Sequence, residues 1–199
     1  MKKLALAIFL CSPLIIYAQE NVPEAQNKAA VCTACHGQQG ISTNPIWPNL
    51  AGQSEKYMVK QLLDIKQNTV RTVPTMTAIM ANLNEQDIHD LAAYYAKMPL
   101  AEGSTPKKYM QRGEQLYRGG DFEKHITACI ACHGPKGTGN AQAGFPVLSG
   151  QHAAYTVLQL QEFKDGKRKN DLNHIMQDIS GRMSQDDMEA VAHYIEGLY

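Results

Sequence analysis

The chain has 199 residues, of which 44% are hydrophobic and 19% are charged. This composition is typical of a globular protein and excludes a disordered chain, and the length allows one domain or two small ones. The 19 Lys and Arg residues balance the 19 Asp and Glu residues, so the formal net charge is zero. A protein that binds nucleic acid by neutralising phosphates is normally more basic, so we expect no nucleic-acid partner.

The N-terminal segment has the three parts of a secretory signal peptide. Lys2 and Lys3 precede an apolar run over residues 4–16, and the small residue Ala18 follows it. The run is shorter than the roughly 20 residues that a membrane span needs, which favours cleavage over a membrane anchor. We expect cleavage after Ala18, so that residues 1–18 and Cys11 are lost on export.

The four remaining cysteines form two copies of the pattern C-x-x-C-H. An exported protein with four cysteines would by default form two disulfides, but this pattern indicates covalent attachment of c-type haem. Positions i, i+3 and i+4 share one face of a helix, so both thiols can bond to the porphyrin edge while the imidazole reaches the iron. The predicted attachment residues are Cys32, Cys35, Cys129 and Cys132, and the predicted proximal iron ligands are His36 and His133.

Two other uses of paired cysteines fit this sequence less well. A zinc ribbon places its two C-x-x-C pairs roughly 15–20 residues apart, whereas these pairs lie far apart in the chain. A thioredoxin-like redox motif requires a βαβ context, and the sequence shows none. Haem attachment is therefore the favoured interpretation, with two c-type haems as the expected cofactors.

The chain is an internal repeat. The segment PNLAGQ at residues 48–53 returns as PVLSGQ at 146–151, and the pairs Tyr57/Tyr155 and Gln61/Gln159 keep the same spacing. A repeat of this length predicts two structural units of similar size. We expect an N-terminal domain over 19–100 and a C-terminal domain over 101–199, each with one haem, joined by a turn-rich segment near residues 99–106.

Both halves are predicted to be helical, with little or no sheet, because no segment shows two-residue alternation. Ser54, Asn84 and Ser184 are suited to cap helices, and Pro106 suits a first helical turn. The expected helices span 23–34, the residues after Ser54 to about 67, 85–98, a segment from 106 onward, 152–164 and 185–198.

The repeat also selects candidates for the second axial ligand of each iron. A methionine thioether opposite histidine raises the iron potential and suits electron transfer. Met76 and Met176 are the methionines that pair across the repeat, and each follows a polar and basic loop that could wrap the open haem face. His174 is a rival ligand, but its counterpart in the first half is Pro74, so the repeat favours Met176.

Two further repeated pairs have alternative roles. Pro48 and Pro146 supply either a backbone carbonyl that orients the proximal imidazole or simply a turn. Arg71 and Arg168 pair either with haem propionates or with solvent in a basic loop.

Several segments, taken together, resemble the diheme cytochrome c4 family over nearly the whole mature chain. They include NPIWP at 44–48, LAGQ at 50–53, GEQLYRGG at 113–120 and GQHAAY at 150–155. The resemblance implies an all-α fold of two tandem class-I cytochrome c domains, related by pseudo-twofold symmetry and each enclosing one covalent haem. It also implies His–Met ligation at both irons, in agreement with Met76 and Met176. This chain departs from the internal repeat near His174, where the second half carries a two-residue insertion.

The resemblance further implies a function. We expect a periplasmic monomer, loosely associated with the membrane, that carries electrons from a membrane-bound quinol oxidoreductase towards a terminal oxidase. Two six-coordinate haems leave no open iron position for a substrate, so we expect no catalysis. Two alternatives stay open, namely a cytochrome subunit of a flavoprotein or other periplasmic dehydrogenase, and a diheme enzyme such as a peroxidase or a thiosulfate dehydrogenase. A cysteine-ligated haem would need a spare thiol, which the mature sequence lacks.

Overall fold

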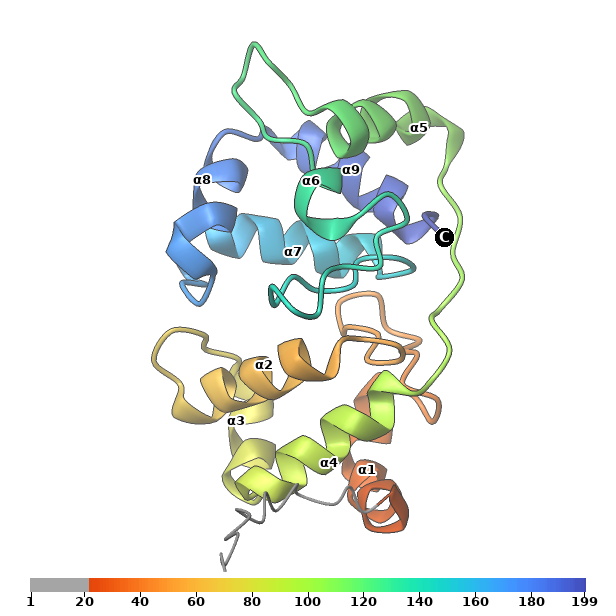
Figure 1. Cartoon of the computed structure of the whole chain (residues 1–199), viewed down its shortest axis with the longest axis vertical. Coiled ribbons are helices and arrows are strands. Elements are labelled where there is room, and N and C mark those ends of the chain that lie inside the picture. The colour runs from red at the N-terminus through yellow and green to blue at the C-terminus, as the bar shows by residue number, and fades with distance from the viewer. Residues whose placement is uncertain (1–21) are drawn as a thin grey trace, which may run out of the picture.

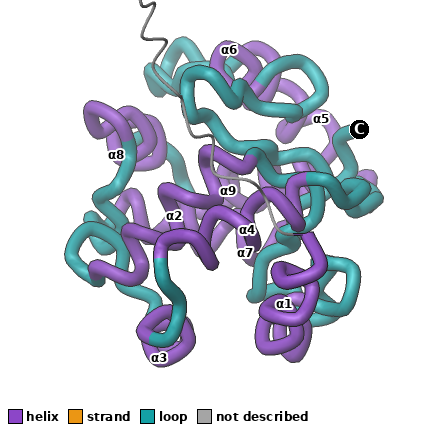
Figure 2. Tube along the Cα trace, turned by 60° about the horizontal axis from the view of Figure 1, so that its bottom comes forward, coloured by secondary structure: helices purple, strands orange, loops and turns teal. Residues whose placement is uncertain are grey.

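The computed structural model describes residues 22–199, which form two helical domains stacked one on the other (Figure 1). The predicted signal peptide lies outside the described residues. Within residues 22–199 there are helices and isolated β-bridges but no β-strand (Figure 2). The prediction of an all-α fold is confirmed. No helix in this part of the chain is long and apolar enough to cross a membrane.

The N-terminal domain is built around its last helix. Helix α4 packs against α1 and α2, and α3 packs against α2. Leu91, Ala92 and Tyr95 of α4 are buried together with Ala29 of α1 and Met58 of α2. The bounds are α1 Val22–His36, α2 Glu55–Gln67, α3 Pro74–Ala81 and α4 Glu85–Ala96.

The C-terminal domain repeats this plan. Helix α9 packs against α5 and α7, and α8 packs against α7. A segment without helix, residues 97–106, links the two domains along one side of the molecule (Figure 1). The bounds are α5 Lys107–Glu114, the π-helix η1 Gln115–Gly119, α6 Ile130–His133, α7 Ala153–Lys164, the 3₁₀ turn η2 Leu172–His174, α8 Ile175–Gly181 and α9 Gln185–Glu196.

The predicted helix caps are confirmed. Ser54 Oγ accepts a hydrogen bond from the Tyr57 amide at the start of α2. Asn84 and Ser184 each form a capping box with the aspartate three residues later, at the starts of α4 and α9. These side chains satisfy amide groups that have no partner inside the helix, which fixes where each helix begins. Helices α4 and α9 end at Ala96 and Glu196, two residues before their predicted ends.

The sequence did not predict helices α3 and α8. Each follows the polar and basic loop, and each is only two turns long. Helices this short have too few residues for a clear periodic pattern, and their stability comes from packing rather than from propensity. They matter for function because they carry Met76 and Met176.

Candidate haem sites and the domain interface

The two attachment motifs lie on helical turns, as their spacing requires. Cys32, Cys35 and His36 occupy the end of α1. In the C-terminal domain, Cys129 precedes α6, and the His133 amide donates to the Cys129 carbonyl at 2.9 Å, which closes the helical turn. Cys32, Cys35, Cys129 and Cys132 form no disulfide within the described residues, which leaves all four able to bond to a porphyrin.

Both motif histidines are buried and held by a proline carbonyl. His36 and His133 are each 6% exposed. The Nδ1 atom of His36 lies 2.9 Å from the Pro48 carbonyl oxygen, and that of His133 lies 2.9 Å from the Pro146 carbonyl oxygen. A carbonyl can only accept, so Nδ1 donates and Nε2 keeps a lone pair for a metal. Of the two roles considered for these prolines, the carbonyl contact is confirmed.

Burial favours the uncharged form of both motif histidines and of the first cysteine in each motif. Burial lowers the pKa of His36 and His133, although the hydrogen bond to the proline carbonyl opposes this effect. Burial also raises the pKa of Cys32, and it raises the pKa of Cys129 to about 12. Neutral imidazoles and thiols can contact an apolar porphyrin without the cost of burying a charge.

The two candidate methionines occupy equivalent places, each in the first turn of its helix. Met176 and Cys129 pack against one core cluster of the C-terminal domain. In the N-terminal domain Met76 and Cys32 pack against two adjoining clusters. These two clusters share the half-buried side chains of Val59, Leu62 and Leu83.

Different local contacts fix the two methionines. The Met76 amide donates to the Val73 carbonyl at 2.9 Å, and Pro74 sets the first turn of α3. The Met176 amide donates instead to a carboxylate oxygen of Asp171 at 2.9 Å. The rival ligand His174 is exposed, and its Nδ1 lies 2.6 Å from Gln177 Nε2.

Two arginines lie at the centre of the domain interface. Arg71 and Arg168 are 7% and 5% exposed, so the alternative of a solvated basic loop is wrong. Their backbones form an antiparallel bridge. Arg71 donates to the Tyr155 hydroxyl of the other domain at 2.9 Å, and Arg168 donates to the Tyr57 hydroxyl at 2.8 Å. The exchange is reciprocal, as pseudo-twofold symmetry requires.

The interface also uses a repeated pair of glutamines. Gln61 Oε1 accepts from Arg71 at 2.6 Å and from Arg168 at 2.9 Å. Gln159 Oε1 accepts from Arg168 at 2.7 Å and from Arg71 at 3.3 Å. The repeat had identified these glutamines and the tyrosines Tyr57 and Tyr155 but had given them no role. Their recurrence at equal spacing on two polar helix faces was the signal for an interface.

The arginine charges change the local electrostatics. Burial by itself would raise the pKa of Tyr57, but Arg168 and Arg71 outweigh it and the net pKa is lowered. The hydrogen-bond partners of the two guanidinium groups are amides and hydroxyls, which carry no negative charge. The buried Nε of Arg71 has no hydrogen-bond partner within the described residues. Burial would lower the pKa of Arg71, but neighbouring groups, among them the Glu162 carboxylate, raise it. Because no carboxylate hydrogen-bonds to either guanidinium group within the described residues, the two buried cations can bind a further anionic group.

These residues fit a c-type haem in each domain. Each half offers two thiols on one helical face, a buried imidazole with a free Nε2 and a thioether packed against the domain core, and the interface offers two cations for acidic substituents. A family model described as cytochrome c matches residues 25–99 and again 110–198. The molecule is therefore a c-type cytochrome with two haem domains.

Known relatives define the family more closely. Cytochrome c4 of Pseudomonas aeruginosa is 44% identical, and the match covers 100% of both chains. The crystal structure of reduced recombinant cytochrome c4 from Pseudomonas stutzeri superposes with a TM-score of 0.87 at 42% identity, over 91% of this chain and 100% of that one. A thiosulfate dehydrogenase electron acceptor of Thiomonas intermedia is 35% identical over 96% of this chain and 88% of its own length.

The chain belongs to the diheme cytochrome c4 family. It is accordingly an electron carrier with two covalently bound c-type haems.

Proposed function

We propose that this chain is a periplasmic carrier that moves electrons through a respiratory chain by means of two His–Met haems. The observation that carries this proposal is the duplicated donor set. In each domain a buried histidine is oriented by a proline carbonyl, and a methionine that pairs across the repeat lies in a short helix and packs against the domain core. The two units of the proposal are the domains 19–100 and 101–199.

In this proposal the four motif cysteines attach the haems, and two histidines and two methionines hold the irons. Cys32 and Cys35 form the thioether bonds of the first haem, and Cys129 and Cys132 form those of the second. The axial pairs are His36 with Met76 and His133 with Met176. When bound, each haem supplies reversible cycling between Fe(II) and Fe(III).

The protein's own groups make this electron exchange fast and selective. The hydrogen bond from Nδ1 to the proline carbonyl keeps each imidazole in one orientation, so little rearrangement accompanies a change of oxidation state. Because His36 and His133 are buried, water would have little access to the histidine side of a bound iron. With both axial positions occupied there is no open site for a substrate, so we propose a carrier rather than an enzyme.

The buried arginine pair has a place in the same proposal. Arg71 and Arg168 serve as counter-ions for haem propionates at the domain interface, because buried charges are stable only when paired. Such pairing would bring the acidic edges of both haems to one interface and favour electron passage between the domains.

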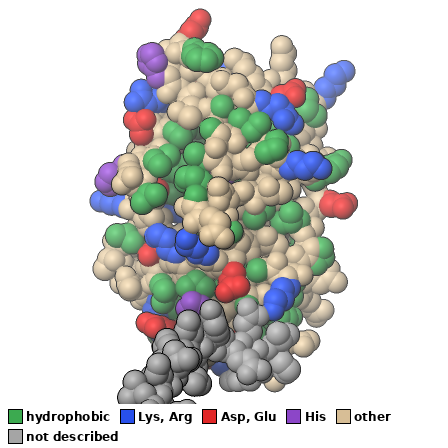
Figure 3. Space-filling view, viewed as in Figure 1, with side chains coloured by type: hydrophobic (Ala, Val, Ile, Leu, Met, Phe, Trp, Pro, Cys, Tyr) green, Lys and Arg blue, Asp and Glu red, His purple; other side chains and the backbone are tan. Residues whose placement is uncertain are grey.

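The partners of the carrier follow from its family and from its surface. We propose a membrane-bound quinol oxidoreductase as donor and a terminal oxidase as acceptor, met in transient complexes by an exported monomer with at most loose membrane association. The face in Figure 3 intersperses positive and negative side chains, which suits brief encounters better than permanent assembly. A second candidate, favoured by the 35% identical relative, is an acceptor of electrons from a thiosulfate dehydrogenase.

The central test is a haem count on variants of the attachment motifs. The mature protein is expected to contain two covalent haems and to titrate as two one-electron centres. Cys32→Ser combined with Cys35→Ser should leave only the covalent haem of the C-terminal domain. Cys129→Ser combined with Cys132→Ser should leave only that of the N-terminal domain. Two covalent haems in either double variant would contradict the attachment sites.

A kinetic test separates the two candidate partners. The oxidised protein is mixed in turn with a reduced quinol oxidoreductase and with a thiosulfate dehydrogenase plus thiosulfate, and haem reduction is followed by absorbance. Faster reduction by the quinol oxidoreductase supports transfer towards a terminal oxidase. Faster reduction by the thiosulfate dehydrogenase supports the role of an electron acceptor for that enzyme.

A further inference from the structure

Each domain uses one glutamine to hold the backbone beside the other domain's haem motif. Gln53 Oε1 accepts from the Val147 amide at 2.9 Å, and Gln53 Nε2 donates to the Val147 carbonyl at 2.9 Å. Gln151 does the same to Asn49, with both distances again 2.9 Å. Each glutamine therefore binds one residue of the opposite domain at two points, and the two contacts repeat each other across the interface.

The residue held in each case follows the proline whose carbonyl contacts the motif histidine. The N–H of Val147 and the C=O of Pro146 belong to one peptide group, and that C=O accepts from His133 Nδ1. A single amide therefore lies between Gln53 of the N-terminal domain and the imidazole of the C-terminal domain.

The reciprocal chain has the same connectivity. It runs from Gln151 through the peptide group of Pro48 and Asn49 to His36. Both domains thus expose the amide that orients their own histidine to a side chain of the other domain.

The glutamine oxygens are fixed in this position by their own chain. Gln53 Oε1 also accepts from the Ser54 amide at 2.9 Å, and Gln151 Oε1 also accepts from the His152 amide at 3.0 Å. Each oxygen therefore has two backbone donors, one from each domain. The arrangement is built into the turns that precede α2 and α7.

Hydrogen bonds that pass through one amide strengthen each other. An amide whose N–H donates carries more negative charge on its oxygen, so that oxygen becomes a better acceptor. A stronger hydrogen bond from Nδ1 makes the imidazole a more basic ligand. A more basic ligand stabilises the oxidised iron more than the reduced iron, which lowers the reduction potential.

We propose that Gln53 and Gln151 are positioning residues that set haem potentials across the domain interface. Gln53 acts on the iron bound by His133, and Gln151 acts on the iron bound by His36. The inference rests on the proposed function for its axial ligands. The potential of each haem thereby depends on the docked state of the opposite domain.

The test is a redox titration of the full-length protein with both haems attached. Gln53→Met removes both hydrogen bonds to Val147, together with the local one from the Ser54 amide, at nearly constant volume. It is expected to raise the potential of the C-terminal haem, to shift the His133 Nδ1–H proton resonance of the reduced protein upfield, and to leave the N-terminal haem unchanged. Gln151→Met is expected to do the reverse. Assigned proton resonances of the two haems tell which centre moves.

Two further variants separate tuning from a loosened interface. Lys56→Met removes the contact of Lys56 Nζ with the Gln142 carbonyl, which spans 2.8 Å across the same interface and does not involve the peptide group that follows either proline. In this control variant neither haem potential is expected to shift relative to the other. Gln53→Leu loses the same hydrogen bonds with a side chain of different shape, so it should raise the same single potential, whereas a loosened interface would shift the haems by amounts that depend on the shape. This variant also provides a measurement if Gln53→Met folds poorly.

The outcomes distinguish this inference from the proposed function. The inference is overturned if both haems shift alike in each glutamine variant, if the haem of the variant's own domain shifts, or if neither haem shifts. A wild-type protein without two His–Met haems contradicts the proposed function instead. A normal wild-type protein with no crossed shift contradicts only the role of the glutamines.

Discussion

In the N-terminal domain, α1 runs without a break into its haem motif, whereas in the C-terminal domain the π-helix η1 and a loop over residues 120–129 separate α5 from α6. Both motifs nevertheless end in a buried histidine bound to a proline carbonyl at the same 2.9 Å. The comparison teaches that the turn after the motif orients the histidine. The helix before the motif is free to vary.

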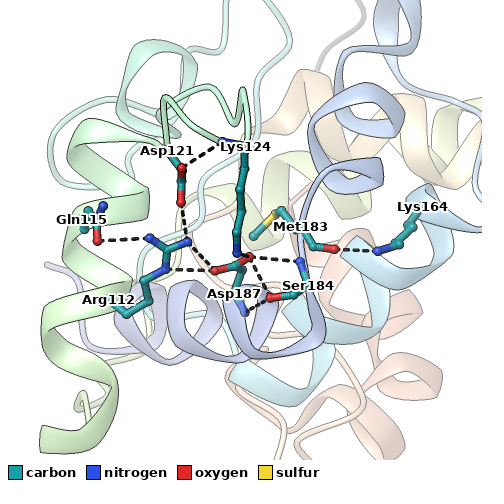
Figure 4. Close-up of polar contacts among 8 residues, drawn as sticks. All are labelled: Arg112, Gln115, Asp121, Lys124, Lys164, Met183, Ser184 and Asp187. Carbon is teal, nitrogen blue, oxygen red and sulfur yellow. Dashed lines mark hydrogen bonds and ion pairs between the residues drawn. The ribbon is translucent and has the colours of Figure 1, made fainter.

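In the C-terminal domain, ion pairs hold the loop that separates α5 from the haem motif. Asp187 at the start of α9 accepts from Arg112 at 2.6 Å and from Lys124 at 2.7 Å, and Arg112 also reaches Asp121 at 2.7 Å (Figure 4). Asp121 and Ile126 close the loop with a backbone bridge. The N-terminal counterpart Asp87 is paired with Lys28 of the unbroken α1. Asp187 thus binds side chains of both helix α5 and the loop, whereas the equivalent Asp87 binds a side chain of helix α1.

The largest expected effect comes from removing the axial methionines. Met76→Ala and Met176→Ala should each alter the spectrum of one haem and lower its potential, because a thioether ligand favours the reduced iron. Asp171→Ala should have a smaller effect on the C-terminal haem alone, since Asp171 holds the Met176 amide and has no equivalent beside Met76. Visible spectra and redox titration check this, and two unchanged haems in Met76→Ala would refute the ligand assignment.

A paired glycine substitution compares the turns that follow the two motifs. A Cβ on Gly150 (φ +67°) would lie 1.9 Å from the Ala101 carbonyl oxygen, whereas one on Gly52 (φ +69°) would lie 2.5 Å from the flexible Leu100 side chain. Both alanines carry the strain of a left-handed backbone, about 1–2 kcal/mol. Gly150→Ala should cost more in total, about 3 kcal/mol or above, because a backbone atom cannot rotate away. Urea unfolding measures both, and equal losses would contradict the stated contacts.

The charge networks are compared by neutralising each cap aspartate. Asp187→Asn should destabilise the protein by about 2–4 kcal/mol, because it leaves Arg112 and Lys124 without their shared carboxylate. Asp87→Asn should cost about 1 kcal/mol, since it loses a single partly exposed ion pair. Denaturant unfolding followed by far-UV circular dichroism gives both values. A loss in Asp87→Asn as large as that in Asp187→Asn would show that the loop network adds nothing.

The smallest expected effect is the pH dependence of the stability that Asp187 and Asp87 contribute. Burial would raise the pKa of Asp187, but hydrogen bonds from Lys124, Arg112 and Ser184 outweigh it and lower the pKa strongly. The Lys28 hydrogen bond is the main cause of the lowered pKa of Asp87. A lowered carboxyl pKa adds stability that is complete above the unfolded value of about 4 and is lost as the pH falls through the folded value.

The stability difference between wild type and Asp187→Asn should therefore be constant from pH 7 down to about pH 5 and shrink below about pH 4. Asp87→Asn should show the same trend with a smaller amplitude. Urea unfolding at several pH values measures the two curves. A difference that grows on acidification would reverse the sign of the linkage and contradict the ion pairs.

Local sequence determined the longer helices and marked the candidate attachment motifs, but not the short helices α3 and α8. Helix caps act on amides three residues away, so Ser54, Asn84 and Ser184 could be identified without any tertiary information. The C-x-x-C-H spacing likewise encodes one helical face. The internal repeat then selected the two candidate methionines and marked the interface positions, although it could not say what those positions contact.

Only the tertiary structure decided which residues are in contact across the domain interface. The burial of Arg71 and Arg168 and the crossed contacts of Gln53 and Gln151 depend on segments that are distant in the chain. No local pattern encodes such contacts, because a polar side chain looks the same in sequence whether water or another domain satisfies it. The sequence by itself thus determined that each half is built to hold a haem, and the docking of the halves decided that each one contacts the backbone beside its partner's histidine.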